Sequence, residues 1–317
     1  MQQQKMRVAL LAGGTSGERE VSLNGAAEVE RSLDPERFQV RRYDPATDLA
    51  RLVNDATEID FAFILLHGLQ GEDGTVQGLL ELLGIPYQGS GVLGSAIAMD
   101  KDLSKVLFRQ YGLPVADSIV IRPSEPFSPG EIVDQLGLPL VVKPVREGSS
   151  LGLTIARTPA ELQAGIDSAK KHDRLVMIEQ YIKGREITAA VLGNDELTAL
   201  PLIEIIPGEG FEFFDYTAKY QAGASKEICP APLSPEQTAT AQKLALEAHS
   251  ALRLRGYSRT DMILDAAGNF FLLESNTIPG MTSTSLLPQA AAQYGLSFPQ
   301  FLDRLIALAF EDRKSQG

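Results

Sequence analysis

Short apolar runs alternate with amphipathic stretches over the first third of the chain. The apolar runs occupy residues 7–12, 38–43 and 59–66, and a helix-like pattern covers residues 20–33. Apolar strands separated by helices are typical of a parallel sheet that is covered on both faces. The glycines after the first run read G-G-x-x-G rather than G-x-G-x-x-G, which argues against a nicotinamide dinucleotide as the ligand. The pattern therefore predicts an α/β domain that binds a ligand other than a nicotinamide dinucleotide.

The pattern changes from about residue 101 onwards. Three segments there carry Ser or Thr, then Pro, then Glu or Gln at the third following position, and they begin at Ser128, Thr158 and Ser234. This combination predicts three helices that each start with a capping box and with Pro in the first turn. Strands are predicted at residues 138–143, 152–156, 175–180 and 185–192. Helices that are segregated from paired strands indicate an α+β layout.

The two patterns divide the chain at about residues 100 and 184. Its 317 residues are a length typical of two or three domains. We expect a Rossmann-like substrate domain over residues 1–100, a central subdomain over residues 101–184 and a C-terminal subdomain over residues 185–317. The predicted fold class is thus α/β followed by α+β.

Composition narrows the possible partners. The chain has 29 Lys and Arg against 41 Asp and Glu, a formal net charge of −12, which argues against nonspecific nucleic-acid binding. The single cysteine, Cys229, cannot form an internal disulfide and so indicates a reducing compartment. No run approaches the roughly 18 apolar residues that a membrane-spanning helix needs. We expect a cytoplasmic protein with no nucleic-acid partner and no membrane association.

The strongest chemical signal is a pair of apolar runs near the C-terminus, at residues 261–265 and 269–274. They bracket a short turn with a glycine and predict a β-hairpin. If residues 266–267 form a two-residue turn, Asp261 faces Leu272 and lies on the same side as Glu274 and Asn276. An odd-length turn would reverse that parity. Three oxygen-bearing side chains on one side suit Mg²⁺, although polar residues at strand ends are also common without any metal.

Three lysines are candidates for phosphate binding. Lys143 ends an apolar strand and precedes the loop Glu147-Gly148-Ser149-Ser150, whose backbone N–H groups could hold phosphate oxygens. Such a loop is also common as a simple turn. Lys101 follows an apolar stretch, and Lys219 lies in an aromatic segment with the composition of a covering loop. Isolated lysines are usually solvated, so whether Lys101 and Lys219 bind phosphate depends on the residues around them.

The three histidines differ in how well their positions suit a role in ligand binding. His67 follows the third apolar run, at the strand end where α/β sheets bind ligands, although it could equally bond to the loop backbone. His172 and His249 fall on helix-like segments of mixed polarity and are predicted to be inert surface residues. With no second histidine near His67 and no cysteine cluster, zinc is not expected.

Seven motifs in order resemble the ATP-grasp superfamily and, within it, the D-alanine:D-alanine ligase family. The resemblance extends from Gly13 to about Asp303, which is nearly the whole chain. The motifs are GGTSGEREVS (13–22), LHGLQGEDGTVQG (66–78), GSGVLGSAIAMDK (89–101), VKPVREGSS (142–150), FFDYTAKY (213–220), GYSRTDMILD (256–265) and LLESNTIPGMTSTS (272–285). Two positions depart from the usual pattern without removing an expected contact: Leu69-Gln70 and Ile278.

The resemblance implies a two-part ATP-grasp fold after the Rossmann-like domain, and a nucleotide site within it. Lys101 and Lys143 would hold the α- and β-phosphates of ATP, and Lys219 the γ-phosphate. Two Mg²⁺ ions, or Mn²⁺ in their place, would bind Asp261, Glu274 and Asn276. The remaining nucleotide contacts would come from Ser150, Glu179, Gln180, Tyr181, Ile182 and Glu186, with Glu186 at the ribose.

The resemblance also implies the amino-acid site. Glu18 would bind the ammonium of a first D-alanine, with His67 beside it, and hydrogen bonds among Glu18, Ser149 and Tyr220 would close the covering loop. Arg259 and the N–H of Gly280 would stabilise the developing oxyanion. The second substrate's carboxylate would bind at Ser285 and Leu286.

The implied reaction is the ATP-dependent joining of two D-alanine molecules through an acyl phosphate, for peptidoglycan precursors, by a homodimeric enzyme. The alternatives are a related ligase that uses D-lactate or D-serine as acceptor, another carboxylate–amine ligase of the same fold, and a nucleotide-binding regulatory domain. The regulatory domain would require the loss of a metal ligand, and all three predicted ligands are present. D-Alanine-dependent release of phosphate from ATP separates a ligase from a binding module.

Overall fold

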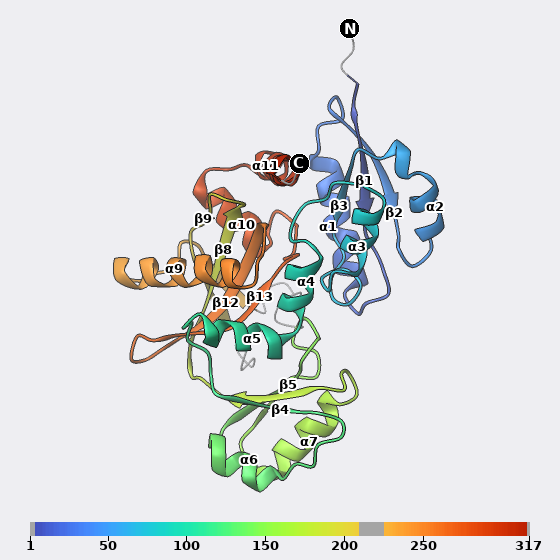
Figure 1. Ribbon diagram of the computed structural model, residues 1–317. Helices are drawn as coiled ribbons and strands as arrows, with labels where there is room; N and C mark the ends of the chain where they lie inside the picture. Colours follow the sequence, from blue (N-terminus) through green and yellow to red (C-terminus); the bar gives the residue numbers. More distant parts are fainter. Residues whose placement is uncertain (1–3, 209–224, 316–317) are drawn as a thin grey trace.

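Three β-sheets, one after another along the chain, form the framework (Figure 1). The computed structural model describes residues 4–208 and 225–315. We call the sheets the N-terminal, central and C-terminal sheets. Among these described residues, no helix is long and apolar enough to span a membrane.

The N-terminal sheet is parallel, as the apolar runs predict. Its order is β2-β1-β3, with β1 (Met6–Leu11) between β2 (Phe38–Tyr43) and β3 (Phe61–Ile64). Alternate β1 residues enter two different apolar cores, Leu10 on one face and Leu11 on the other, so the sheet is covered on both faces. The accompanying helices are α1 (Arg19–Ser32), α2 (Leu49–Asn54), a 3₁₀ turn (Ala56–Glu58), α3 (Thr75–Leu82) and α4 (Val92–Met99).

The central sheet is antiparallel and follows α5 (Lys101–Gln110). Its order is β4-β7-β5-β6, formed by β4 (Ser118–Ile121), β5 (Leu140–Pro144), β6 (Thr154–Ala156) and β7 (Val176–Gln180). Two helices, α6 (Pro129–Leu136) and α7 (Pro159–Ala169), cover one face with an apolar core. Figure 1 shows them at the bottom of the molecule, on the side away from the C-terminal sheet.

The C-terminal sheet is also antiparallel, with the order β11-β10-β8-β12-β13 and with β9 beside β8. One face packs against α9, whose Ala241, Ala245 and Ala248 meet Ile187 and Met262 in an apolar core. The small alanines let the helix approach the sheet closely. The elements are β8 (Gly184–Gly193), β9 (Thr198–Ala199), β10 (Ile203–Pro207), β11 (Ser225–Ile228), α9 (Pro235–Ala251), β12 (Gly256–Asp265) and β13 (Phe270–Asn276).

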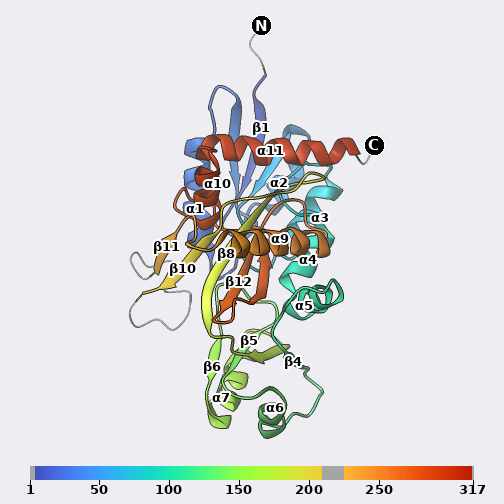
Figure 2. The same cartoon turned by 90° about the vertical axis from the view of Figure 1, so that its left-hand side faces the viewer.

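The last two helices are α10 (Leu286–Tyr294) and α11 (Phe298–Ser315). Leu302, Leu305 and Ile306 of α11 join the same apolar core as Leu10 of β1 and Phe61 of β3. Figures 1 and 2 both show α11 next to the N-terminal sheet. The end of the chain therefore completes a core that its beginning starts.

All three predicted helix starts are confirmed, but only one is a complete capping box. Ser128, Thr158 and Ser234 each accept a hydrogen bond from the N–H three residues ahead. Among these three starts, only Ser234 has the reciprocal bond, in which Gln237 Oε1 accepts from Ser234 N at 3.1 Å. Glu161 instead accepts from the N–H of Arg157, one residue before the cap, so the prediction of three full boxes was wrong.

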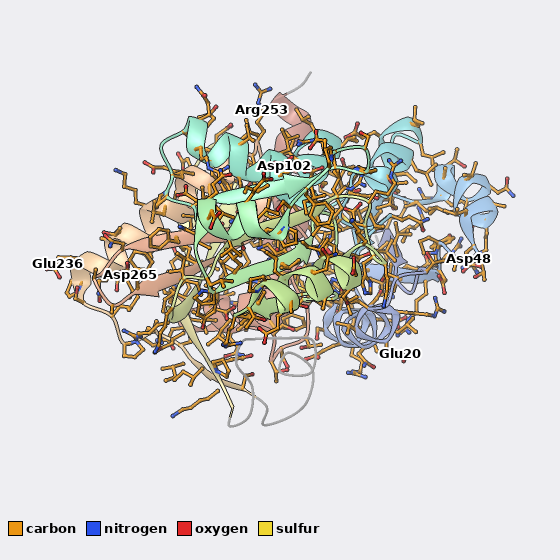
Figure 3. The ribbon with its side chains drawn as sticks, turned by 90° about the horizontal axis from the view of Figure 1, so that it is seen from below. Glu20, Asp48, Asp102, Glu236, Arg253 and Asp265 are labelled. Carbon is orange, nitrogen blue, oxygen red and sulfur yellow. The ribbon has the colours of Figure 1, made fainter. Side chains whose placement is uncertain are left out.

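The predicted hairpin exists, but its two-residue turn was wrong. Asp265 N donates to Asn269 O, so the turn contains the three residues 266–268, and Gly268 takes a φ of 90° there. Met262 therefore pairs with Leu272. A bulge then shifts the register by one more residue, so that Asp261 pairs with Glu274 instead of Leu272. Figure 3 shows Asp265, at the end of the hairpin, near an outer edge of the molecule.

Candidate active site

Two adjoining cavities lie where the three sheets approach one another. The first, which we call the nucleotide cavity after the residues that the resemblance assigns to ATP, lies between the central and C-terminal sheets, with Lys143 and Glu179 on one side and Glu186 and Asp261 on the other. The second, which we call the amino-acid cavity, is lined from all three sheet regions. Ser149 lines both cavities, so a group in one can reach a group in the other there.

The alternation of side chains along the central strands explains one wall of the nucleotide cavity. Leu140 and Val142 of β5 face the helices, so Val141 and Lys143 point to the cavity. In the same way Ile178 of β7 is in the core while Glu179 faces the cavity. Lys143 Nζ lies 2.5 Å from Glu179 Oε1, so the lysine predicted to bind phosphate is held by a carboxylate in this structure.

The loop after β5 has an unusual backbone. Ser149 and Ser150 have φ angles of 49° and 58°, in the left-handed region that residues with a side chain rarely adopt. The ammonium of Lys101 donates to the carbonyl of Glu147 at 2.7 Å, which ties the loop to the start of α5. Two adjacent strained residues beside two lysines are typical of a loop shaped for a ligand.

The three predicted metal ligands lie together at the edge of both cavities. Asp261 accepts hydrogen bonds from Asn276 Nδ2 at 3.1 Å, from Thr188 Oγ1 at 2.7 Å and from the guanidinium of Arg259 at 2.8 and 2.7 Å. Glu274 Oε2 lies 3.0 Å from Lys101 Nζ. Two carboxylates and one amide oxygen are donors that fit Mg²⁺. In this structure Arg259 and Lys101 supply positive charge beside these carboxylates, where a metal ion would also place it.

The first part of the amino-acid cavity contains a buried acid. Glu18 follows the glycine-rich turn after β1 and is the N-cap residue of α1. Its Oε1 accepts a hydrogen bond from Ser149 Oγ, which joins the N-terminal domain to the loop after β5. His67 is also buried there, with Nδ1 3.1 Å from the carbonyl oxygen of Ile278, and burial lowers the pKa of His67. A neutral imidazole beside a carboxylate suits an ammonium ligand better than a second cation would.

The far end of the amino-acid cavity is formed by a tight turn and a helix start. Ser285 is the N-cap residue of α10, and its Oγ accepts from Thr282 N at 3.1 Å. A Cβ on Gly280 would lie 2.9 Å from Ser285 Oγ, so a larger residue there would force the Ser285 hydroxyl to move. The first N–H groups of α10 follow Ser285, and a helix start favours negative charge. This end of the cavity therefore suits a carboxylate.

The structure brings together every described residue that the sequence analysis assigned to the site. Lys219 and Tyr220 lie outside the described residues. In the nucleotide cavity are Lys101, Lys143, Ser149, Ser150, Glu179, Gln180, Tyr181, Ile182, Glu186, Asp261 and Glu274. In the amino-acid cavity are Glu18, His67, Ser149, Arg259, Asn276, Gly280, Ser285 and Leu286. Their proximity is a finding, whereas their individual roles stay predictions.

Three acidic residues that line the amino-acid cavity were missed: Glu20, Glu72 and Glu227. Glu72 accepts from Gly68 N at 2.7 Å, and burial together with the nearby Glu18 raises the pKa of Glu72 to about 8. Glu227 on β11 accepts from Gln289 Nε2, which also donates to the carbonyl of Thr284 at 2.6 Å. Glu72 lies within the quoted LHGLQGEDG motif and could have been considered. Glu227 carries no signal in the sequence, because only the β10–β11 pairing brings it to the cavity.

A buried lysine was also missed. Lys105 of α5 has a side chain that is 0% exposed, and its Nζ lies 2.7 Å from Glu179 Oε2. It stands four residues after Lys101 and so on the same side of the helix. The sequence pattern gave no reason to place a lysine inside the protein.

The prediction that His249 is an inert surface residue was wrong about its position. His249 is 1% exposed, and its Nδ1 lies 2.8 Å from Ser258 Oγ of β12. Burial lowers the pKa of His249 to about 4. The error arose because α9 is mostly polar and alanine-rich, so its buried face has few large apolar residues to mark it. The exposed position of His172 agrees with the prediction.

Most of the chain matches models of known protein families. A family model described as D-ala D-ala ligase C-terminus matches residues 107–307, and one described as D-ala D-ala ligase N-terminus matches residues 44–90. The chain is 60% identical over 315 residues to a D-alanine–D-alanine ligase of Desulfotalea psychrophila. That alignment covers 99% of this chain and 97% of the relative.

Two solved structures are similar over nearly the whole chain. A D-alanine–D-alanine ligase of Bacillus anthracis complexed with ATP superposes with a TM-score of 0.87 at 36% identity and covers 98% of this chain and 100% of its own. A D-Ala:D-Ser ligase of Enterococcus faecalis superposes with a TM-score of 0.83 at 34% identity, covering 96% of this chain and 100% of its own.

Proposed function

The chain belongs to the D-alanine–D-alanine ligase family, and we propose that its two cavities hold ATP and two molecules of D-alanine for the ATP-dependent synthesis of D-alanyl-D-alanine. The fold is of the ATP-grasp type, and the dipeptide serves peptidoglycan synthesis. One observation carries the proposal: a lysine-lined cavity and an acid-lined cavity meet at Ser149, and Asp261 of the first is hydrogen-bonded to Arg259 and Asn276 of the second.

The first step needs a leaving group, because a carboxylate and an amine do not form an amide spontaneously in water. The carboxylate of the first D-alanine attacks the γ-phosphorus of ATP, which forms an acyl phosphate and releases ADP. Lys101 and Lys143 are on the correct cavity walls to hold the α- and β-phosphates, and Lys219 is proposed for the γ-phosphate. Their charges offset the negative charge that develops during phosphoryl transfer.

We propose that Asp261, Glu274 and Asn276 hold Mg²⁺, as two ions, with Mn²⁺ able to replace them. When bound, the metal neutralises phosphate charge and orients the transferred group. The support is the set of oxygen donors on paired strands and the cations that now compensate the same carboxylates. A metal held by these oxygens would supply the positive charge that Arg259 and Lys101 place beside Asp261 and Glu274 in this structure.

Arg259 would then act in both steps of the reaction. Its guanidinium and the N–H of Gly280 line the amino-acid cavity, where the acyl phosphate and the tetrahedral intermediate carry negative oxygen. Glu18 receives the ammonium of the first D-alanine, with His67 beside it. Ser285 and Leu286, at the start of α10, receive the carboxylate of the second. The amine of the second D-alanine then attacks the acyl carbon and displaces phosphate.

The adenosine part of ATP is proposed to lie at the other end of the nucleotide cavity. Glu186 is assigned to the ribose, and the segment Glu179, Gln180, Tyr181 and Ile182 to the adenine edge and face, with Ser150 toward the phosphates. Glu179 and Gln180 end β7, and Tyr181 and Ile182 lead from it to β8, so this segment forms the connection between the two ATP-grasp subdomains. Lys219 and Tyr220 are assigned to the covering loop, whose closure excludes water from the acyl phosphate.

Three coarser features belong to the same proposal. The chain is divided into domains near residues 100 and 184, where α5 and β8 begin. A cytoplasmic location is supported by the requirement for ATP and by the single cysteine. A homodimer is supported by exposed apolar residues on α3 and α4, among them Leu82 and Leu93. Sedimentation of the purified protein, alone and with Leu93→Glu, tests the dimer.

The alternative acceptors, D-lactate and D-serine, are not favoured, because the D-alanine–D-alanine relative is 60% identical while the D-Ala:D-Ser ligase is 34% identical. Acidic residues also outnumber basic ones among the described residues of the amino-acid cavity, where Glu18, Glu20 and Glu227 accompany Arg259, even without Glu72, whose pKa of about 8 leaves it mostly protonated near neutral pH. A zwitterionic acceptor suits that charge better than the anion D-lactate. The test is a competition of equal D-alanine, D-serine and D-lactate near neutral pH, with products separated by mass. Mostly depsipeptide or D-alanyl-D-serine would contradict the assignment.

A further inference from the structure

Lys105 is a charged group that the proposed reaction does not use. Its side chain is 0% exposed, and lysines are almost never fully buried unless they are paired. It lies on α5, behind the wall of the nucleotide cavity, while Lys143 and Glu179 line that wall. Burial lowers the pKa of Lys105, so the ion pair must compensate for a real cost.

Glu179 is shared between two lysines. Its Oε2 lies 2.7 Å from Lys105 Nζ and its Oε1 lies 2.5 Å from Lys143 Nζ, and its own side chain is 3% exposed. The other contact of Lys105 Nζ is with the carbonyl of Leu272 at 3.4 Å, which is at the limit of a hydrogen bond. The main electrostatic partner of Lys105 is therefore Glu179. Two buried cations and one anion leave one positive charge for a ligand.

The arrangement has a consequence for phosphate binding. A phosphate bound at Lys143 competes with Glu179 for the single positive charge of that ammonium. If Glu179 had no other partner, that competition would leave a buried carboxylate without a cation, which is strongly unfavourable. Lys105 pairs with the other oxygen of the same carboxylate, so it can compensate Glu179 when Lys143 turns to a phosphate.

We propose that Lys105 is a positioning residue for the nucleotide: a permanent counter-ion for Glu179 that leaves Lys143 available to the phosphates of ATP. The inference rests on the proposed function for the identity of the ligand. It adds a residue that acts through Glu179 and Lys143 rather than by touching the nucleotide.

The test compares Lys105→Met with the double variant Lys105→Met/Glu179→Gln. Binding of ADP with Mg²⁺, measured by titration calorimetry, should weaken by about tenfold in Lys105→Met. The double variant should recover most of that loss, because it has no carboxylate to compensate and a glutamine amide can still hydrogen-bond to the adenine edge. KM for D-alanine should stay unchanged in Lys105→Met, since the amino-acid cavity is separate. Lys105→Arg, which keeps the charge, should bind ADP nearly as the unaltered protein does.

Lys243→Met is the matched control, because Lys243 is an exposed lysine on α9 and its loss should change neither ADP binding nor KM. Unchanged ADP affinity in Lys105→Met would overturn the inference. A double variant as weak as Lys105→Met would also overturn it, since Lys105 would then act by packing alone. If Lys105→Met does not fold, Glu179→Gln is compared with the double variant, and weaker ADP binding by the double variant contradicts the proposal. The proposed function fails separately, if D-alanine does not stimulate ADP release by the unaltered protein.

Discussion

Replacement of His249 by Gln should reduce the acid sensitivity of the fold. His249 is enclosed between α9 and β12, and its Nδ1 is 2.8 Å from Ser258 Oγ. Burial lowers the pKa of His249 to about 4, so the imidazole is neutral in the folded protein. The unfolded chain should bind its proton near the ordinary histidine value of about 6.5. Protons are therefore taken up on unfolding between these two values.

The sign and size of the effect follow from that difference. The stability contribution of neutral His249 is fully present above about pH 6.5 and is lost as the pH falls toward 4, since only the unfolded state gains the proton. At about pH 5 the two pKa values give a loss of about 2 kcal/mol relative to neutral pH. A glutamine side chain at this position could still bond to Ser258 but cannot titrate.

The assay is urea unfolding followed by circular dichroism, at pH 7.5 and pH 5, for the unaltered protein and His249→Gln. The free energy of unfolding should fall between the two pH values by about 2 kcal/mol less in the variant. His172→Gln serves as the control, because His172 is exposed and its replacement should leave the pH difference unchanged. Equal pH differences in the unaltered protein and in His249→Gln would refute the reasoning.

Three further predictions concern the active site. Glu274→Gln should abolish D-alanine-dependent ADP release without lowering the melting temperature, and near-normal turnover at saturating Mg²⁺ would remove Glu274 from the metal site. Gly280→Ala would place a Cβ 2.9 Å from Ser285 Oγ, so KM for the second D-alanine should rise by about tenfold while ADP affinity stays the same. An unchanged KM would show that Ser285 does not hold the acceptor. Ser149→Ala removes the hydrogen bond to Glu18 and should lower kcat/KM for D-alanine by about tenfold, as measured by ADP release; unaltered kinetics would count against that link.

The sequence predicted most elements of the fold because their signals are local. Ser128, Thr158 and Ser234 mark helix starts through residues within one turn of each other, and the apolar runs of the N-terminal sheet need no knowledge of distant parts. The packing of α11 on β1 and β3 was not predicted, because it joins the two ends of the chain.

The metal site shows how a correct grouping can follow from a wrong register. A three-residue turn shifts the pairing of the hairpin by one residue, and the bulge opposite Asp261 and Met262 shifts it by another. The two shifts keep Asp261 and Glu274 on one side, which parity alone could not foresee. Residues such as Lys105 and Glu227 were missed for a different reason. Their significance depends on burial and on strand pairing, and neither is encoded in the neighbouring sequence.

The position of α11 also constrains the order in which the protein can mature during synthesis. Leu10 and Phe61 emerge early from the ribosome, but Leu302, Leu305 and Ile306, which cover them, emerge nearly last. Residues of α1 cover part of this face early, but the part that α11 covers remains exposed to water and to other chains throughout translation of the segments between. Chaperones should therefore bind to this exposed surface during synthesis. A chain that ends before α11 because of a premature stop codon should aggregate through the same surface.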